Sequence, residues 1–204
     1  MKTFLKIALL LIVTALPNST WAAQNILVFG DSLSAGYGIS RNASWVSLLQ
    51  EELRKNHPQY EVINASISGE TTSGGLRRID KALAQHQPTI VIVELGANDG
   101  LRGTTIAETE KNLRQIISKS KKVNAAVLLL GMRLPPNYGL EYSAQFRVLF
   151  SKVAKSQKIS LVPFMLEGIS PEQFQADNLH PSAAAQTQIL QNVFPSLKPF
   201  LKRN

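Results

Sequence analysis

The stretch Ile26-Leu27-Val28-Phe29-Gly30-Asp31-Ser32-Leu33 leads from four consecutive apolar residues into a short polar turn. A short apolar run that ends at a glycine predicts a buried strand of a parallel sheet. Ser32 follows the end of this strand, where open parallel sheets bind their ligands, and is therefore a candidate nucleophile. The alternative is that Asp31 and Ser32 only cap the next turn, because both side chains accept hydrogen bonds from backbone N–H groups.

Similar apolar runs recur along the chain and alternate with helical patterns. Strands are predicted at 26–29, 62–63, 90–93, 125–130 and 159–162. Helices are predicted between them, where apolar residues recur at helical spacing: Trp45, Leu48, Leu49 and Leu53; Leu76, Ile79 and Leu83; Ile106, Leu113, Ile116 and Ile117; and Phe146, Leu149, Phe150 and Val153. A last helix over 182–197 is predicted to have Pro181 at its first position. This alternation predicts the α/β class, as a three-layer α/β/α domain with a five-stranded parallel sheet.

Residues 1–22 have the pattern of a secretory signal peptide. Two lysines precede an apolar run over 7–16, and small residues stand at the −3 and −1 positions of a cleavage site after Ala22. Cleavage after Ala23 is one alternative, and an amphipathic first helix of the domain is another. The apolar run is too short to span a bilayer. We therefore expect removal of residues 1–22, a single mature domain over 23–204 without a transmembrane segment, and a periplasmic or secreted protein.

Charge and composition narrow the classes of partner. The sequence carries 22 Lys and Arg against 14 Asp and Glu, a net charge of +8 that becomes +6 without the two lysines of the signal peptide. The basic residues are scattered and lack aromatic interleaving, which favours solvated faces over a nucleic-acid site, with attraction to anionic lipid as a weaker alternative. The sequence has no cysteine and three histidines, so neither disulfides nor a zinc site are expected. We expect a monomer, since no apolar heptad pattern calls for a partner.

Polar segments follow three further strands at their carboxyl ends. Ser68-Gly69-Glu70-Thr71 comes after the second strand, Gly96-Ala97-Asn98-Asp99-Gly100 after the third, and Asp177 and His180 after the fifth. A serine served by a distant acid and imidazole is what serine-based acyl transfer requires. Each segment also has a plainer interpretation: a turn glycine, a tight Asn-Asp-Gly turn, and a helix N-terminal acid beside a surface histidine. The convergence of four such segments at one sheet edge favours a catalytic site.

Together these segments resemble the four blocks of the SGNH (GDSL-type) hydrolase family. Longer stretches at 65–71, 93–103 and 133–139 are similar to the bacterial periplasmic group of acyl-CoA thioesterases, lysophospholipases and arylesterases. The resemblance extends over essentially the whole mature chain, and it implies the flavodoxin-like SGNH hydrolase fold. The usual α/β-hydrolase arrangement is disfavoured, because the sequence contains no G-x-S-x-G motif.

The resemblance implies a role for each of five residues. Ser32 is expected to attack an ester or thioester carbonyl and to form an acyl-enzyme. His180 is expected to take the serine proton and return one to the leaving group, while Asp177 orients the imidazole. The expected oxyanion hole consists of the backbone N–H groups of Ser32 and Gly69 and the side-chain amide of Asn98.

The resemblance further implies a secreted serine hydrolase that acts on fatty acyl-CoA and other acyl thioesters, aryl esters and lysophospholipids, without a cofactor or a metal. Residues that could line an apolar groove for the acyl chain are Leu101, Leu134, Pro135, Tyr138, Met165, Leu166 and Ile169; ordinary anchoring of the loops is the alternative. Two other functions stay open. One is a carbohydrate acetylesterase that uses the same site, and the other is a non-catalytic flavodoxin-like binding module, for which the sequence offers no phosphate-binding motif.

Overall fold

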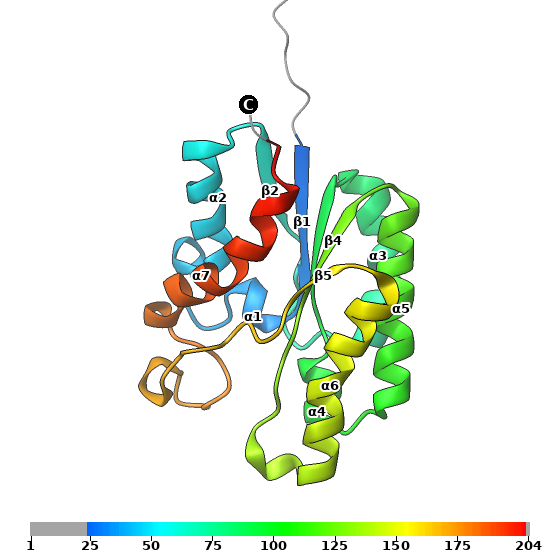
Figure 1. The fold of residues 1–204 in the computed structure, drawn as a ribbon. Helices are drawn as coiled ribbons and strands as arrows, with labels where there is room; N and C mark the ends of the chain where they lie inside the picture. Colours follow the sequence, from blue (N-terminus) through cyan, green and yellow to red (C-terminus); the bar gives the residue numbers. More distant parts are fainter. Residues whose placement is uncertain (1–23, 203–204) are drawn as a thin grey trace, which may run out of the picture.

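Five parallel strands form the centre of the computed structural model, which describes residues 24–202 (Figure 1). The strands are β1 (Gln24–Gly30), β2 (Tyr60–Asn64), β3 (Ile90–Glu94), β4 (Ala126–Leu130) and β5 (Ser160–Val162). They lie in the order β2-β1-β3-β4-β5, and every neighbouring pair is parallel, which confirms the predicted sheet. The predicted signal peptide, residues 1–22, and both candidate cleavage sites lie outside the described residues.

Helices cover both faces of the sheet (Figure 1), which confirms the predicted three-layer α/β/α class. α2 (Trp45–Asn56) and α7 (Gln186–Leu197) pack together on one face, and α3 (Thr72–His86), α5 (Ile106–Lys122) and α6 (Leu140–Gln157) lie side by side on the other. The short helices α1 (Ser32–Ala35) and α4 (Ala97–Leu101) follow β1 and β3. The remaining turns are the 3₁₀ helices η1 (Arg41–Ala43), η2 (Pro136–Tyr138), η3 (Pro171–Gln173), η4 (Ala183–Ala185) and η5 (Lys198–Phe200). Within residues 24–202, no helix combines the length and the apolar character that crossing a membrane requires.

The strand order reverses at β1, and this reversal decides where the polar loops meet. From β1 the chain moves out to β2, and it then returns to β3 on the other side of β1. In open parallel sheets, ligands bind outside the carboxyl ends of the strands at such a reversal. Ser32, Gly69 and Asn98 follow β1, β2 and β3 respectively, so the topology brings all three to one edge of the sheet.

Burial on both faces explains the apolar runs of the central strands. Residues 26–29 of β1 and 90–93 of β3 are almost fully buried and pair in register, with Phe29 opposite Val93. A strand that is covered by helices on both sides has no solvent face, and its sequence is therefore continuously apolar. The edge strand β2 differs, because Glu61 is exposed.

The predicted starts of β4 and β5 are each one residue early. The N–H of Ala125 donates to the carbonyl of Ser120 in α5, and the N–H of Ile159 donates to the carbonyl of Ala154 in α6. Both apolar residues are therefore occupied in closing the preceding helix and do not enter the sheet. The apolar pattern does not show that Ala125 and Ile159 close a helix instead of starting a strand, because buried or half-buried residues occur in both places.

The predicted start of the last helix is also wrong. α7 begins at Gln186, residues 183–185 form a 3₁₀ turn, and Pro181 pairs with Phe174 in an isolated bridge. Gln186 explains the break, because its Oε1 accepts from the N–H of Trp45 at 3.0 Å and its Nε2 donates to the carbonyl of Ser182 at 3.2 Å. The buried amide of this side chain thus holds the preceding turn out of the regular helix.

Glu94, the last residue of β3, is fully buried opposite Gly30 of β1. Its Oε2 accepts from the N–H of Asp31 at 3.2 Å and from the Ser34 hydroxyl at 2.8 Å, while Oε1 has no partner among the described residues. A Cβ at position 30 would lie 2.6 Å from this Oε2 and 3.0 Å from the main-chain carbonyl oxygen of Glu94, so a larger residue there has to displace a buried group. Burial, together with the Asp31 carboxyl nearby, raises the pKa of Glu94 well above its ordinary value, and burial raises the pKa of Asp31 to about 6.

Leu128 and Leu140 provide a matched test of the buried sheet. Leu128 of β4 has no exposed surface, whereas Leu140, at the start of α6, is 91% exposed. We expect Leu128→Ala to lower the free energy of unfolding by about 2–5 kcal/mol, because the substitution leaves a cavity in the core. Leu140→Ala should change it by about 0.5 kcal/mol or less. Denaturant unfolding followed by circular dichroism measures both values, and equal losses would contradict this difference in burial.

Glu94 predicts a pH dependence of stability with a definite sign. Its pKa is raised on folding, so as the pH rises above the ordinary value of 4.5 the unfolded chain releases a proton that the folded protein keeps. The free energy of unfolding therefore falls as the pH rises. We expect Glu94→Gln to reduce this fall, by at most about 1.4 kcal/mol per pH unit, which corresponds to one proton. Urea unfolding at a series of pH values measures the slope. The exposed Glu61→Gln is the control, and a slope that Glu94→Gln leaves unchanged would refute a buried protonated carboxyl.

Candidate active site

Ser32 lies at the junction of β1 and α1, with 8% of its surface exposed. The side chain that caps α1 is that of Asp31, whose Oδ1 accepts from the N–H of Leu33 at 3.0 Å. The hydroxyl of Ser32 instead lies 2.8 Å from Nε2 of His180. Asp31 therefore caps α1, as the alternative prediction stated. Ser32 does not, and its hydroxyl contacts the imidazole of His180 from a distant loop.

Asp177 holds the other side of the His180 ring. Nδ1 of His180 lies 2.6 Å from Oδ2 of Asp177, and Oδ1 accepts from the N–H groups of His180 and Leu179, both at 2.9 Å. The hydrogen bond from the His180 N–H, joined by that from Leu179, lowers the pKa of Asp177 to about 2. The carboxylate is thus ionised at neutral pH and favours a proton on Nδ1, which leaves the lone pair of Nε2 facing Ser32.

The loop over 174–181, which carries the acid and the imidazole, is tied to itself and to α1. The N–H of Gln175 donates to the carbonyl of His180 at 2.8 Å. The side chain of Gln175 donates to the carbonyl of Tyr37 at 2.8 Å, just after α1. The Tyr37 ring also lies against the imidazole, with the two centroids 4.5 Å apart. These contacts hold the imidazole beside the start of α1.

Gly69 lies in the turn after β2 with a φ of 77°, a left-handed conformation that favours glycine. Its carbonyl accepts from Nη2 of Arg102 at 3.0 Å. Among residues 24–202, neither the N–H of Gly69 nor that of Ser32 donates to another protein group. Both N–H groups therefore lack a protein acceptor among the described residues, and their role as oxyanion donors stays a prediction.

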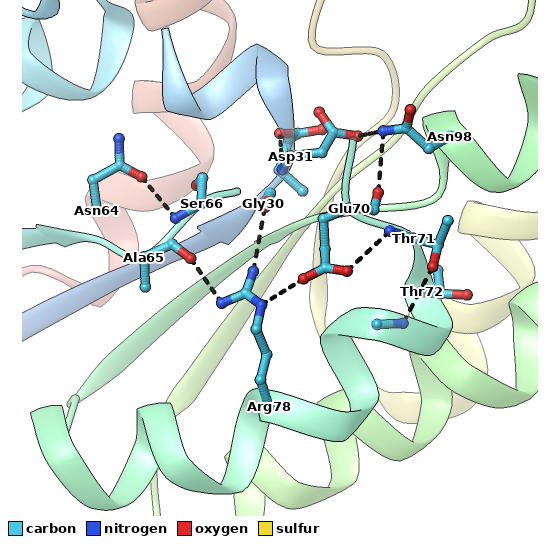
Figure 2. A network of polar contacts seen from close by, with 12 residues as sticks. Gly30, Asp31, Asn64, Ala65, Ser66, Glu70, Thr71, Thr72, Arg78 and Asn98 are labelled. Atoms are coloured by element: carbon cyan, nitrogen blue, oxygen red, sulfur yellow. Dashed lines mark hydrogen bonds and ion pairs between the residues drawn. The ribbon is translucent and has the colours of Figure 1, made fainter. Parts of the chain in front are cut away.

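The side chain of Asn98, in the first turn of α4, reaches the same region (Figure 2). Its Nδ2 donates to Oδ2 of Asp31 at 3.0 Å and to the carbonyl of Glu70 at 3.1 Å. Both amide N–H groups thus have acceptors, so an oxyanion held by Asn98 has to share one of these donors or replace its acceptor. The structure brings Asn98 to the site, and its role as an oxyanion donor stays a prediction.

A hollow of about 400 Å³ opens beside the catalytic candidates, and Ser32, His180 and Asn98 form part of its wall. Most of the remaining wall is apolar. Of the residues predicted to form an acyl groove, those that line this hollow are Leu101, Leu134, Pro135 and Leu166. These side chains come from α4 and from the loops after β4 and β5, so the hollow is built at the same sheet edge as the triad candidates.

Three other predicted groove residues do not line this hollow. Met165 is fully buried in the core, because the chain continues along the sheet edge, where its N–H donates to the carbonyl of Gly131 at 3.1 Å. Ile169 packs against the core from the same loop. Tyr138 lies half-buried in η2. For Met165 and Ile169, the structure therefore favours loop anchoring, which was the alternative.

The sequence prediction missed several wall residues: Met132, Arg133, Phe164, Phe174 and Leu179. Met132 and Phe164 each stand two positions beyond the end of a strand, so the rule that singled out Ser32 was sufficient to find them. Arg133 combines a contact with the Phe164 ring, at 4.4 Å from Cζ to the centroid, with an ion pair to Glu167 at 3.1 Å. No pattern in the sequence indicates that pairing.

A larger hollow of about 510 Å³ lies between α2 and β2, with Arg41, Glu51 and Arg54 in its wall. None of the triad candidates lines it, so the reactive groups gather in the smaller, apolar hollow. Within residues 24–202, no three or more His, Asp or Glu side chains are grouped in a way that could hold a metal ion.

The chain is similar to known proteins over most of its length. A model of the GDSL-like lipase/acylhydrolase family matches residues 28–188. The esterase TesA of Pseudomonas aeruginosa is 48% identical over 182 residues, which are 88% of this chain and 90% of that protein. The thioesterase 1/protease 1/lysophospholipase L1 of Escherichia coli is 43% identical over 185 residues, which are 90% of this chain and 88% of that protein.

A solved structure is also similar. The crystal structure of the psychrotrophic esterase EstA from Pseudoalteromonas sp., inhibited by monoethylphosphonate, is similar at a TM-score of 0.83 and 40% identity, over 87% of this chain and 98% of that chain. The family model and the relatives thus span nearly all of the described residues, and they confirm the resemblance that the four sequence blocks indicated. The chain belongs to the GDSL-like lipase/acylhydrolase family of hydrolytic enzymes.

Proposed function

We propose that this protein is a serine esterase and thioesterase that forms an acyl-enzyme on Ser32. The observation that carries the proposal is the line of two short contacts from Asp177 through His180 to Ser32, at 2.6 and 2.8 Å. A proton can pass from the hydroxyl to the imidazole along this line while the carboxylate stabilises the imidazolium that forms. Relatives named esterase and thioesterase support this chemistry.

Acylation uses the groups in the order in which the site presents them. Oγ of Ser32 attacks the carbonyl carbon of the substrate as Nε2 of His180 takes the hydroxyl proton. The carbonyl oxygen becomes an oxyanion, which the N–H groups of Ser32 and Gly69 and the amide of Asn98 stabilise. The bond to the leaving alcohol or thiol then breaks, and His180 gives its proton to that group.

Deacylation repeats the sequence with water. His180 removes a proton from a water molecule, whose oxygen attacks the acyl carbon. The second tetrahedral intermediate uses the same oxyanion donors, and its collapse breaks the bond to Oγ of Ser32. His180 returns the proton to this oxygen, and the products are the carboxylic acid and the free serine.

We propose fatty acyl thioesters, aryl esters and lysophospholipids as the substrates. The apolar wall of the hollow beside Ser32 supports this class, because it can bury a hydrocarbon chain. Each methylene that it buries contributes about 0.8 kcal/mol. The name of the Escherichia coli relative, which includes both thioesterase and lysophospholipase, supports the same range. No observation favours a sugar acetate over these substrates.

We also propose that the protein is exported to the periplasm or secreted. The support is the basic start, short apolar run and small residues of 1–22, which follow the pattern of a signal peptide. An exported enzyme meets acyl esters of the envelope or the medium, whereas acyl-CoA is made in the cytoplasm. We therefore propose lysophospholipids and other extracytoplasmic acyl esters as its substrates in the cell.

Ser32→Ala and His180→Ala test the acyl-enzyme. Each should abolish labelling by a fluorophosphonate probe and lower the rate of p-nitrophenyl butyrate hydrolysis by roughly 10⁶-fold, as the loss of a triad serine or histidine does elsewhere. Gel fluorescence and steady-state kinetics measure the two effects. Ser118→Ala, at an exposed serine of α5, is the matched control and should behave as the wild type. Equal labelling of Ser32→Ala and the wild type would sink the proposal.

Leu134→Trp tests the acyl hollow. The larger side chain should fill part of the wall and exclude long chains, so kcat/KM for a dodecanoyl ester should fall by about 10-fold or more, the equivalent of two or three methylenes left unburied. The acetyl ester should change by roughly twofold at most, since it needs little of the hollow. Val123→Trp, 46% exposed at the end of α5, is the control. Equal effects of Leu134→Trp on both esters would place the acyl chain elsewhere.

A further inference from the structure

Arg78 of α3 joins three segments that carry the site (Figure 2). Its Nε donates to Oε2 of Glu70 at 2.6 Å, and its Nη1 donates to the carbonyl of Ala65 at 2.8 Å. Nη2 reaches the carbonyl of Gly30 at 3.5 Å, the outer limit of a hydrogen bond. The side chains of Arg78 and Glu70 are only 22% and 12% exposed. This guanidinium is therefore part of the framework of the site and is not a solvated surface charge.

The carbonyls that Arg78 contacts lie where two strands end. Beyond β2 the chain stays bonded to β1, because the N–H of Ala65 donates to the carbonyl of Val28 at 2.9 Å and that of Ile67 to the carbonyl of Gly30 at 3.0 Å. The Arg78 guanidinium, from α3, adds hydrogen bonds to carbonyls on both of these segments. The centroid of the buried Phe29 ring lies 3.9 Å from Cζ of Arg78, so the guanidinium also packs against an aromatic ring.

The contacts of Arg78 with Glu70 and with the carbonyls at the two strand ends are called the clamp below. Glu70 connects this clamp to the predicted oxyanion donors Gly69 and Asn98. It directly follows Gly69, and its Oε1 accepts from the N–H of Thr71 at 3.2 Å. Its carbonyl accepts from Nδ2 of Asn98 at 3.1 Å (Figure 2). A shift of the Glu70 main chain would therefore move the Gly69 N–H and release the Asn98 amide at the same time.

We propose that Arg78 is a positioning residue of the oxyanion hole, which acts through Glu70 on Gly69 and Asn98. The inference rests on the proposed function, because it assumes that these groups hold an oxyanion formed at Ser32. Without the guanidinium, the largely buried carboxylate of Glu70 loses its cation and keeps only a backbone donor, so the turn has to rearrange. Displacements of about 1 Å in such groups are sufficient to lower a rate about 10²-fold.

The neighbouring Arg77 supplies a matched control. It precedes Arg78 on α3, is exposed, and donates to the hydroxyl of Ser73 at 3.0 Å. Arg77→Met removes the same charge from the same turn of the helix without touching the clamp. Arg78→Lys is the conservative variant, because an ammonium group keeps the charge but lacks the planar fork that spans several acceptors.

Steady-state kinetics on an acyl ester separates positioning from binding. Arg78→Met should lower kcat by about 10- to 100-fold and leave KM within about twofold, because the clamp supports groups used in the transition state and does not touch the acyl hollow. Arg78→Lys should recover part of kcat, and Arg77→Met should match the wild type. Thermal unfolding shows whether each variant is folded at the assay temperature. If Arg78→Met is not, Glu70→Gln replaces it, with the same expected loss of kcat.

A double-mutant cycle distinguishes this role from a general structural one. If Arg78 acts through the oxyanion donors, Arg78→Met should cost several-fold less in an Asn98→Ala background than in the wild type, because residues that act as a unit are not additive. Fully additive losses, or a loss equal to that of Arg77→Met, would overturn the proposal.

Ser32→Ala, assayed beside these variants, distinguishes a failure of the proposed function from a failure of the inference about Arg78. If Ser32→Ala stays active, the proposed function fails and the inference fails with it. If Ser32→Ala is inactive while Arg78→Met retains a normal kcat, the inference about Arg78 alone is wrong.

Discussion

The 2.8 Å hydrogen bond between Ser32 and His180 joins residues that are 148 positions apart. It forms only when β1 carries Ser32 to the sheet edge and the loop over 174–181 returns beside it. Closing so long a segment costs chain entropy, which the burial of β1 and β3 between two helical layers has to offset. The contact between these two side chains is therefore a product of the complete sheet, and partial folding of either end of the chain leaves Ser32 apart from His180.

Sequence patterning was sufficient where one strong constraint dominates. The strands β1 and β3 are buried on both faces, so their apolar runs identified them, and the strand-end rule located the segments that meet at the reversal in strand order. Sequence patterning failed where a contact with a distant side chain determines the local structure. The start of α7 depends on the amide of Gln186, which accepts from Trp45 in a helix 141 positions earlier. Met165 directly precedes Leu166, which lines the hollow beside Ser32, yet the side chain of Met165 is buried in the core.

The supports of the site were the part least visible in the sequence. Arg78 lies in an amphipathic helix, where a charge ordinarily indicates a solvent-facing position, and Glu94 ends an apolar strand without any periodic signal. Asp99 has the same character: its Oδ2 accepts from the N–H of Thr72 at 2.8 Å and so ties the start of α3 to α4. Burial raises the pKa of this carboxyl. Hydrogen bonds between residues of different elements determine these roles, and such contacts leave no period in a sequence.

The missing side chain of Gly30 has a consequence for how this protein can change. The space that a Cβ would need is filled by the carboxyl of Glu94, 64 positions further along the chain. The packing of Glu94 on the neighbouring strand, together with Ser34, thus restricts the first letter of the Gly-Asp-Ser-Leu motif. We expect a smaller residue at position 94 to relieve the closest contact and so to lessen, without removing, the loss of stability on substitution at position 30, because the main-chain carbonyl of residue 94 and Oγ of Ser34 would still lie 3.0 Å from the new Cβ. A library that varies either position alone would miss every sequence in which both have changed.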